Sequence, residues 1–180
     1  MKRAKGREPL GEAALMEYAV RALASRMRTE RELRRLMKIR AEIGAEGERA
    51  MDAVVARLKG LNYLSDTRFA ADYTRLRKEN EKFGRRRVQQ DLAAKGVAAE
   101  LVGAAVGAAY EGVDEAALAR EYVARKRMKQ PSGEKKEKET ARVVGRLLRA
   151  GFSVGAVFKV LREWGVEVEE GELEGAGDAE

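Results

Sequence analysis

Internal repetition is the feature of this 180-residue sequence that most limits how it folds. Two stretches, 92–106 and 147–161, carry apolar residues at the same positions when they are aligned on Gly96 and Gly151. In each stretch a helical pattern reaches the glycine, one apolar residue follows, and a second helical pattern begins. A glycine just after a helix favours the left-handed backbone that closes it. We therefore predict the same helix–turn–helix motif in both stretches.

The repetition continues upstream of the two glycines. Phe69–Tyr73 parallels Leu118–Tyr122, because each places an apolar residue and a tyrosine four positions apart on one helical face. The later copy is longer between tyrosine and glycine, and the excess matches a segment of loop composition, 130–137. A looser first copy includes Thr29–Glu32, which has the pattern of a capping box at the start of a helix.

The predicted fold class is all-α, with nine helices in three tandem three-helix repeats that form an elongated, curved array. The apolar residues recur with a helical period, and only two prolines interrupt the chain. Each repeat is too small to hold a full core, so stacking would bury the faces left open. The alternative is one globular bundle whose internal similarity is accidental. The predicted divisions are a disordered basic arm at 1–11, repeats at 12–62, 63–112 and 113–165, and an acidic tail at 166–180.

The charge of the chain is strongly uneven. The net charge is +7, yet the segment 167–180 holds seven acidic residues and no basic one. The rest of the chain therefore carries all of the positive excess. Such a body suits a polyanion, or a protein already bound to one. The alternative reading is that the charge serves solubility alone.

Several classes of function are excluded by what the sequence lacks. It has no cysteine and no histidine, which removes disulfides, thiolate chemistry and the usual general base. Phosphate-binding glycine loops are also absent. We therefore predict that the protein is not an enzyme and uses no metal or cofactor. No apolar run is long enough to span a membrane, and the basic N-terminus lacks an apolar signal region, so we expect a cytoplasmic monomer.

Basic residues cluster in every repeat, most densely at Arg85–Arg87. These arginines fall in the first turns of a predicted helix, where cations oppose the helix dipole. A sequence that bears this cost favours an anionic partner, although Asp91 and nearby glutamates are an alternative source of neutralisation. We predict that the binding residues are Arg26, Arg28, Arg31, Arg35, Arg75, Arg77, Lys78, Arg85, Arg86, Arg87, Lys95, Arg125 and Arg127.

The aromatic residues are too few to make a stacking platform for single-stranded nucleic acid. The tyrosines fall at apolar helical positions or at junctions between repeats, so we predict that they pack in cores. The sequence also contains no helix rich in asparagine, glutamine and arginine that would read bases directly. The residues concerned are Tyr18, Tyr63, Tyr73, Tyr110 and Tyr122.

Four segments, in order and at fitting spacing, resemble the RecX family of regulatory proteins. The junction Asn62–Ala70 resembles that family's Gly-Tyr-Leu-Asp-Asp-x-Arg-Phe-Ala motif, and Gly84–Val97 resembles the segment that follows it. Ala14–Leu33 resembles the opening helices, and Arg149–Ser153 the last glycine turn. The similarity covers about residues 14–163. Asn62 stands where the family has glycine, but asparagine tolerates the left-handed backbone, so the turn should survive.

This resemblance implies an all-helical tandem repeat from a bacterial cytoplasm, with a role in DNA repair, recombination and the SOS response. It also implies a partner, the RecA recombinase filament on single-stranded DNA. Members of the family are thought to lie in the groove of that filament, to limit its growth and to restrain strand exchange and co-protease activity. The basic residues named above would then contact the filament.

Two other functions stay open on the sequence alone. The chain could bind DNA directly without RecA, which its positive charge favours. It could also be a helical adaptor for a different acidic protein. Binding to an oligonucleotide without RecA would separate the first alternative from filament regulation, and a partner that is neither RecA nor DNA would support the second.

Overall fold

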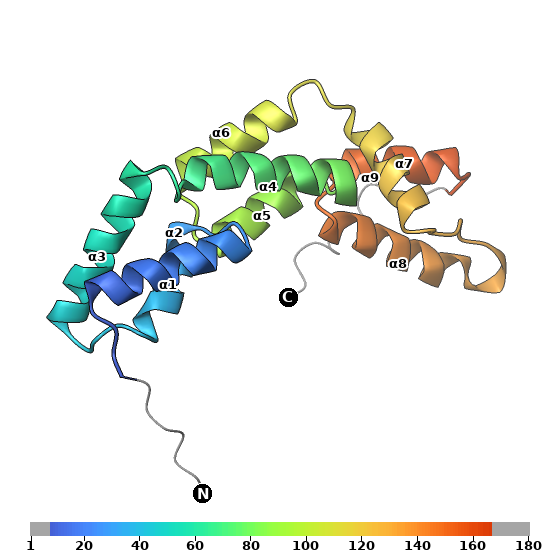
Figure 1. The fold of residues 1–180 in the computed structure, drawn as a ribbon. Helices are drawn as coiled ribbons and strands as arrows, with labels where there is room; N and C mark the ends of the chain where they lie inside the picture. The colour runs from blue at the N-terminus through green and yellow to red at the C-terminus, as the bar shows by residue number, and fades with distance from the viewer. Residues whose placement is uncertain (1–7, 167–180) are drawn as a thin grey trace, which may run out of the picture. The chain divides into compact units, whose positions relative to one another are not determined.

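The computed structural model describes residues 8–166, and within that range the chain is all-helical, as predicted (Figure 1). Nine α-helices and one 3-10 turn follow one another in the described residues, with no strand among them. The order fits three helices per predicted repeat, while the elongated and curved arrangement stays a prediction. The helices are α1 (Glu12–Ser25), α2 (Glu30–Lys38), α3 (Ala45–Gly60), α4 (Asp66–Glu81), α5 (Arg85–Ala94), α6 (Ala99–Ala109), α7 (Glu115–Arg125), α8 (Lys136–Arg149) and α9 (Val154–Glu163).

The helices gather into two compact units. The first unit comprises the chain up to Ala70 together with Leu92–Val102, and the second comprises Ala71–Asp91 and the chain from Gly103 onward. Helices α4, α5 and α6 each begin in one unit and end in the other. The second predicted repeat therefore contributes to both units. The boundaries of the three repeats themselves stay a prediction.

The core of the first unit is aliphatic. Leu15, Leu33, Met37 and Leu58 are fully buried on the facing sides of α1, α2 and α3. Leu33 and Met37 are four residues apart, so they lie on one face of α2. Replacing such a side chain with alanine typically lowers the free energy of unfolding by about 2–5 kcal/mol. These residues therefore contribute strongly to the packing of the three helices.

Aromatic residues organise the core of the second unit. The ring of Tyr122 on α7 meets the edge of Phe152 at a centroid distance of 5.7 Å and lies 6.2 Å from Phe83. Phe152 is fully buried, as are Leu147 and Leu161 on α8 and α9. The apolar residue that follows the glycine turn, Phe152, is thus a central core residue of this unit.

The left-handed turns occur where the sequence predicted them. Gly96 and Gly151 have φ values of +81° and +92°, and Asn62 adopts the same region at +58°. In the first repeat, α3 begins at Ala45 and includes Gly47. Gly47 is buried, and a β-carbon there would overlap the carbonyl of Glu42.

The part of the chain that the structure describes extends slightly into both predicted terminal segments, the arm at 1–11 and the tail at 166–180. Leu10, placed in the basic arm, donates a backbone hydrogen bond of 2.7 Å to the Arg40 carbonyl and pairs with Ala41. Val166, placed in the acidic tail, is buried and donates to the Leu161 carbonyl at 3.0 Å. The disorder predicted for the arm is therefore wrong at Leu10, which packs against the core of the first unit, while the acidic tail stays a prediction. The remainder of both segments, 1–7 and 167–180, lies outside the described residues.

The helices of the described chain include none with both the length and the apolar character needed to cross a membrane.

Candidate cationic interface

The first glycine turn lies against the start of α2. We call this contact the first joint. The hydroxyl of Thr29 donates to the Lys95 carbonyl at 2.8 Å and accepts from the Glu32 amide at 3.1 Å. The Glu32 carboxylate accepts the Thr29 amide at 3.3 Å, which completes the predicted capping box. The Lys95 ammonium reaches the Glu32 carboxylate at 2.9 Å. A β-carbon on Gly96 would overlap the side chain of Arg31, so glycine permits this close approach.

The second glycine turn lies against the start of α5 in the equivalent way, and we call this contact the second joint. Here the backbone makes the bonds: the Gly84 amide donates to the Ala150 carbonyl at 2.8 Å, and the Arg86 amide donates to the Gly151 carbonyl at 3.3 Å. A β-carbon on either glycine would overlap backbone atoms of the facing segment. The second joint therefore fixes the start of α5 without using its side chains.

The arginine cluster at the start of α5 is thus held by main-chain contacts, as Gly84 is buried and Arg85, Arg86 and Arg87 are exposed. Arg85 donates to the Tyr110 carbonyl at 3.4 Å, and Arg87 pairs with Asp91 at 3.0 Å. The side chain of Arg86 has no ion pair or hydrogen bond within residues 8–166. The sequence alternative of neutralisation by Asp91 therefore applies to Arg87 but not to Arg86.

A second set of basic residues lies on α8, and the sequence analysis missed it. Four exposed side chains occur at spacings of four, four and three residues, so they share one face of the helix. None forms an ion pair with another described residue. The spacing was readable in the sequence, although it lies beside a segment of loop composition. We call Lys138, Arg142, Arg146 and Arg149 the α8 row.

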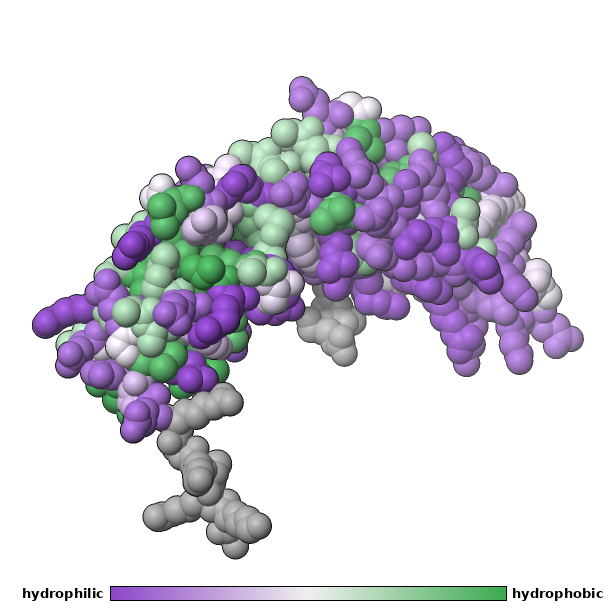
Figure 2. Space-filling model, in the orientation of Figure 1, coloured by the Kyte–Doolittle hydropathy of each residue, from purple (hydrophilic) through white to green (hydrophobic). Residues whose placement is uncertain are grey.

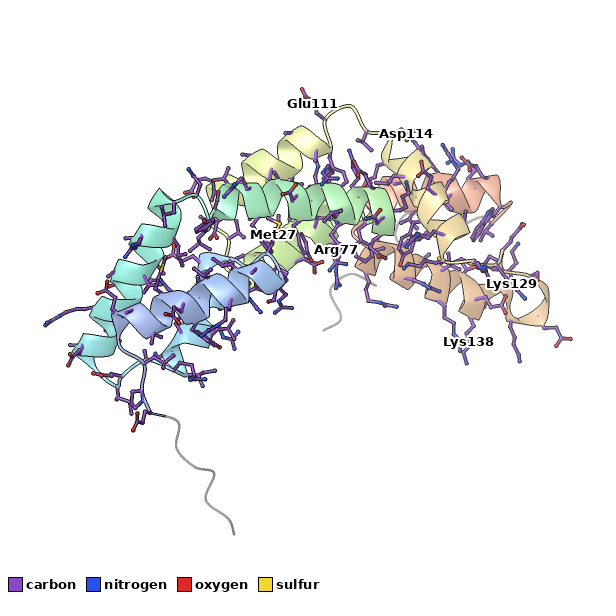
Figure 3. All side chains as sticks on the ribbon, viewed as in Figure 1. Met27, Arg77, Glu111, Asp114, Lys129 and Lys138 are labelled. Carbon is purple, nitrogen blue, oxygen red and sulfur yellow. The ribbon has the colours of Figure 1, made fainter. Side chains whose placement is uncertain are left out.

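The second joint connects these two sets. Arg149 immediately precedes Ala150 and Gly151, whose carbonyls receive the amides of Gly84 and Arg86. The α8 row therefore ends beside the start of α5. Figure 3 shows the labelled Lys138 projecting from α8 away from the neighbouring helices, and Figure 2 shows a mainly hydrophilic surface over α8. We call the α8 row together with Arg85 and Arg86 the cationic interface.

Three predicted binding residues are held in ion pairs instead. Arg75 lies 3.4 Å from Asp72 and 3.3 Å from Glu79 along α4. Arg125 is 3.9 Å from Glu81 in the second unit, and Lys95 belongs to the first joint. These pairs are partly exposed, and exposed pairs typically contribute less than about 1 kcal/mol. They nevertheless reduce the charge that Arg75, Lys95 and Arg125 offer to a partner.

Two further predicted residues lie against aromatic rings. The Arg77 guanidinium is 4.9 Å from the ring centre of Tyr73, and the Lys78 ammonium is 5.9 Å from that of Tyr110. Lys78 also donates to the Ala109 carbonyl at 2.6 Å. Burial raises the pKa of the Tyr110 phenol, which stays protonated and donates to the Phe83 carbonyl at 2.7 Å. Arg77 and Lys78 thus contribute to packing within the second unit.

The remaining predicted residues do not join the cationic interface as a single set. Arg26 is exposed at the end of α1, and Arg28 donates to the Ala22 carbonyl at 3.1 Å. Arg127 is exposed just after α7, with a φ of +48°. Arg31 and Arg35 line a hollow of about 660 Å³ in the first unit, beside Lys38.

Acidic residues share that hollow with the bases of α2. Glu30 binds Lys59 at 2.5 Å and Arg34 at 2.8 Å. Partial burial alone would raise the pKa of Glu30, but the hydrogen bonds from Lys59 and Arg34 outweigh it and lower that pKa. Partial burial raises the pKa of Asp66, which accepts the Glu30 amide at 2.8 Å. The hollow is therefore a mixed-charge surface.

The prediction that every tyrosine packs in a core is wrong for Tyr63, whose exposed fraction is 63%. It follows the left-handed Asn62 in the α3–α4 connection, which turns its side chain outward, and Leu64 is the buried residue there. Between residues 8 and 166, no group of three acidic residues is placed to hold a metal ion.

Fold and surface together define a helical-repeat protein that presents a cationic interface beside one of its glycine-turn joints. Comparison with known proteins assigns this class to a family. A family model described as the second three-helix domain of RecX matches residues 65–106. The chain is 31% identical over 172 residues to the regulatory protein RecX of Streptomyces coelicolor, covering 96% of this chain and 87% of that protein.

Other relatives agree. The regulatory protein RecX of Escherichia coli strain SE11 is 37% identical over 122 residues, covering 63% of this chain and 70% of that protein. The crystal structure of RecX from Lactobacillus salivarius has a TM-score of 0.63 at 18% identity, over 86% of this chain and 96% of that one, and so shares the fold. The chain belongs to the RecX family of regulatory proteins, which confirms the resemblance seen in the sequence.

Proposed function

We propose that this protein regulates the RecA recombinase without catalysing a reaction itself. It binds the RecA filament on single-stranded DNA in the bacterial cytoplasm and inhibits recombinase and co-protease activity. The family membership supports the partner. The observation that carries the proposal is the cationic interface, whose Arg86 and α8 row lack ion pairs within the described chain.

The chemistry of this interface suits a phosphate backbone. Arginine presents several donors in a fixed fork that matches phosphate oxygens, and it stays charged at all physiological pH values. Because main-chain bonds hold the start of α5, its arginines need not rearrange before they bind. The α8 row extends the contact along one helix face, so several phosphates are engaged together, which raises the effective concentration of each further contact.

ATP hydrolysis by RecA on single-stranded DNA tests the proposal. The wild-type protein should lower the hydrolysis rate at stoichiometric amounts. The double variant Arg86→Glu/Arg149→Glu should lose most of this inhibition, since it reverses two charges of the interface. Arg49→Glu/Arg57→Glu makes the same charge change on exposed positions of α3 and should inhibit normally. No inhibition by the wild-type protein would contradict the proposal.

Direct binding to DNA without RecA is the second candidate, and the interface favours it as well, because Arg86 and the α8 row form no ion pair with the described residues. Affinity for a fluorescent single-stranded oligonucleotide should then fall steeply with salt, by about 0.7 logarithmic units per tenfold salt change for each phosphate contact. Arg86→Glu/Arg149→Glu should reduce that slope by about 1.4. Tight binding without RecA, together with unchanged ATP hydrolysis, would favour this candidate over filament regulation.

A further inference from the structure

The hollow in the first unit has two walls of opposite charge. Arg31, Arg35 and Lys38 occur at spacings of four and three on α2, so they form one basic wall. Glu48 and Asp52 are one turn apart on α3 and form an acidic wall. Met51 lies between the acids and is only 7% exposed, so it closes the floor.

The charges of the hollow balance one another. Four basic and four acidic side chains line it. The three residues of the basic wall form no ion pair within residues 8–166, while Asp52 keeps an exposed pair with Arg34 at 2.7 Å. A phosphate backbone drawn to the basic wall would face Glu48 and Asp52 across the hollow, and like charges repel. The hollow therefore disfavours nucleic acid and fits a ligand that carries both signs of charge.

Apolar side chains are exposed in the loop that connects the two helices carrying the walls. Ile39 and Ile43 lie in the loop that joins α2 to α3, and their exposed fractions are 79% and 102%. Large aliphatic side chains this exposed gain nothing from phosphate, whereas a protein partner removes them from water. Figure 2 shows apolar side chains gathered on the viewed face of the first unit.

We infer that the hollow between α2 and α3 is a docking site for an amphipathic protein helix. Such a helix would carry acidic residues toward α2, basic residues toward α3, and an apolar residue over Ile39 and Ile43. Charge complementarity on both walls defines the occupant and its orientation. The inference rests on the proposed function: the helix belongs to the protein component of the filament, while the cationic interface takes the DNA.

The test compares two affinities for each variant. One is for RecA filaments assembled on a labelled single-stranded oligonucleotide, and the other is for that oligonucleotide alone. Ile39→Ser/Ile43→Ser leaves the net charge unchanged. It should weaken filament binding about tenfold, because a few central apolar contacts carry most interface energy, and should leave oligonucleotide binding unchanged. Leu61→Ser/Leu76→Ser removes exposed apolar residues elsewhere and is the matched control.

A second variant gives effects of opposite sign. Glu48 is exposed, and its carboxylate has no bonded partner among the described residues, so Glu48→Lys should still fold, with only the small cost of a cation in the first turn of α3. It should weaken filament binding, because the acidic wall would then repel the basic residues of the docked helix. It should slightly strengthen oligonucleotide binding, because the protein gains positive charge. Strengthening of both affinities would overturn the inference, since it would show that the hollow binds nucleic acid.

The remaining outcomes are also decisive. If wild-type protein inhibits RecA but Ile39→Ser/Ile43→Ser binds filaments normally, the proposed docking site is wrong, whereas the proposed function is still supported. If that variant weakens both affinities equally, the hollow is a nucleic-acid surface and the inference is wrong. If wild-type protein neither binds nor inhibits the filament, the proposed function fails and the inference falls with it.

Discussion

The two joints solve the same packing problem with different groups. In both, the start of a repeat's second helix donates a hydrogen bond to the carbonyl that precedes the next repeat's glycine. The first joint uses the Thr29 hydroxyl, reinforced by the Lys95–Glu32 ion pair, whereas the second uses the amides of Gly84 and Arg86. The position filled by Glu32 in the first joint is filled by Arg87 in the second.

This difference shows that side chains are available for a partner at the second joint rather than at the first. In the first joint the Thr29 hydroxyl and the charged side chains of Lys95 and Glu32 are engaged in the packing contact itself. In the second joint the main chain makes the contact, so Arg85 and Arg86 stay available at a helix start whose dipole opposes their charge. When backbone atoms make a joint, the side chains at that joint are not needed for packing and can serve to bind a partner.

The largest effect is expected from Gly151→Ala. A β-carbon there would overlap the Arg87 amide nitrogen, and the φ of +92° is unfavourable for alanine. Backbone overlap and a left-handed residue together should cost about 3–5 kcal/mol of unfolding free energy. Urea denaturation followed by circular dichroism measures this loss. A cost below about 1 kcal/mol would show that the second joint is looser than described.

Gly96→Ala should cost less, about 1–2 kcal/mol. Its φ of +81° is similar, but the atoms that its β-carbon would meet belong to the flexible side chain of Arg31. That side chain moves aside more easily than backbone. The same denaturation experiment measures the cost. If the losses for Gly96→Ala and Gly151→Ala were equal, the distinction between side-chain and backbone joints would break down.

Thr29→Val should cost about 1–2 kcal/mol, because the fully buried hydroxyl both caps α2 and donates to the Lys95 carbonyl. Valine keeps the shape of the side chain and removes both bonds. Thr29→Ser keeps the hydroxyl and is the control. Hydrogen exchange should show faster exchange of the α2 amides in Thr29→Val, and protection equal to that of wild type would contradict this role.

The smallest effect, below about 1 kcal/mol, is expected from Glu32→Gln, and it should depend on pH. Partial burial would raise the pKa of Glu32, but the hydrogen bond from Lys95 outweighs it and lowers that pKa below its ordinary value. A lowered carboxyl pKa stabilises the fold at neutral pH, and this stabilisation disappears as the pH falls through the lowered value.

Unfolding free energies of wild type and Glu32→Gln should therefore differ at pH 7 and converge as the pH falls through the lowered pKa of Glu32. Because Glu30 and Asp66 are present in both proteins, their titration cancels in the comparison. A difference that persists unchanged in acid would show that the Glu32–Lys95 pair is not its source. The second joint, made of amides and carbonyls, should show no such pH dependence.

Local signals in the sequence predicted much of this fold. Glycine after an apolar helical run predicted the turns at Gly96 and Gly151, and the Thr29 pattern predicted its cap, because these depend on neighbouring residues. The segment that each glycine faces was not predictable. Gly151 must be glycine because of Arg87, sixty-four positions away in the chain, and no local pattern encodes such a contact.

The candidate site was less predictable than the fold. The density of Arg85–Arg87 marked the right place, but only coordinates distinguish Arg86 from the ion-paired Arg87. Arg75 and Arg125 look equally basic in the sequence, yet each pairs with a carboxylate. The α8 row was visible as a helical spacing of bases and needed only the recognition that 138–149 is helix.

The glycine-turn joint also has a direction, since each turn meets the second helix of the repeat before it. An inserted copy of one whole repeat would contact both neighbours in the existing way. Its glycine turn would pack against the second helix of the repeat before it, and the start of its own second helix would receive the glycine turn of the repeat after it. Gene duplication could therefore lengthen such a chain without the invention of a new contact. The two joints, one of side chains and one of backbone, show that the same connection can be made with different groups.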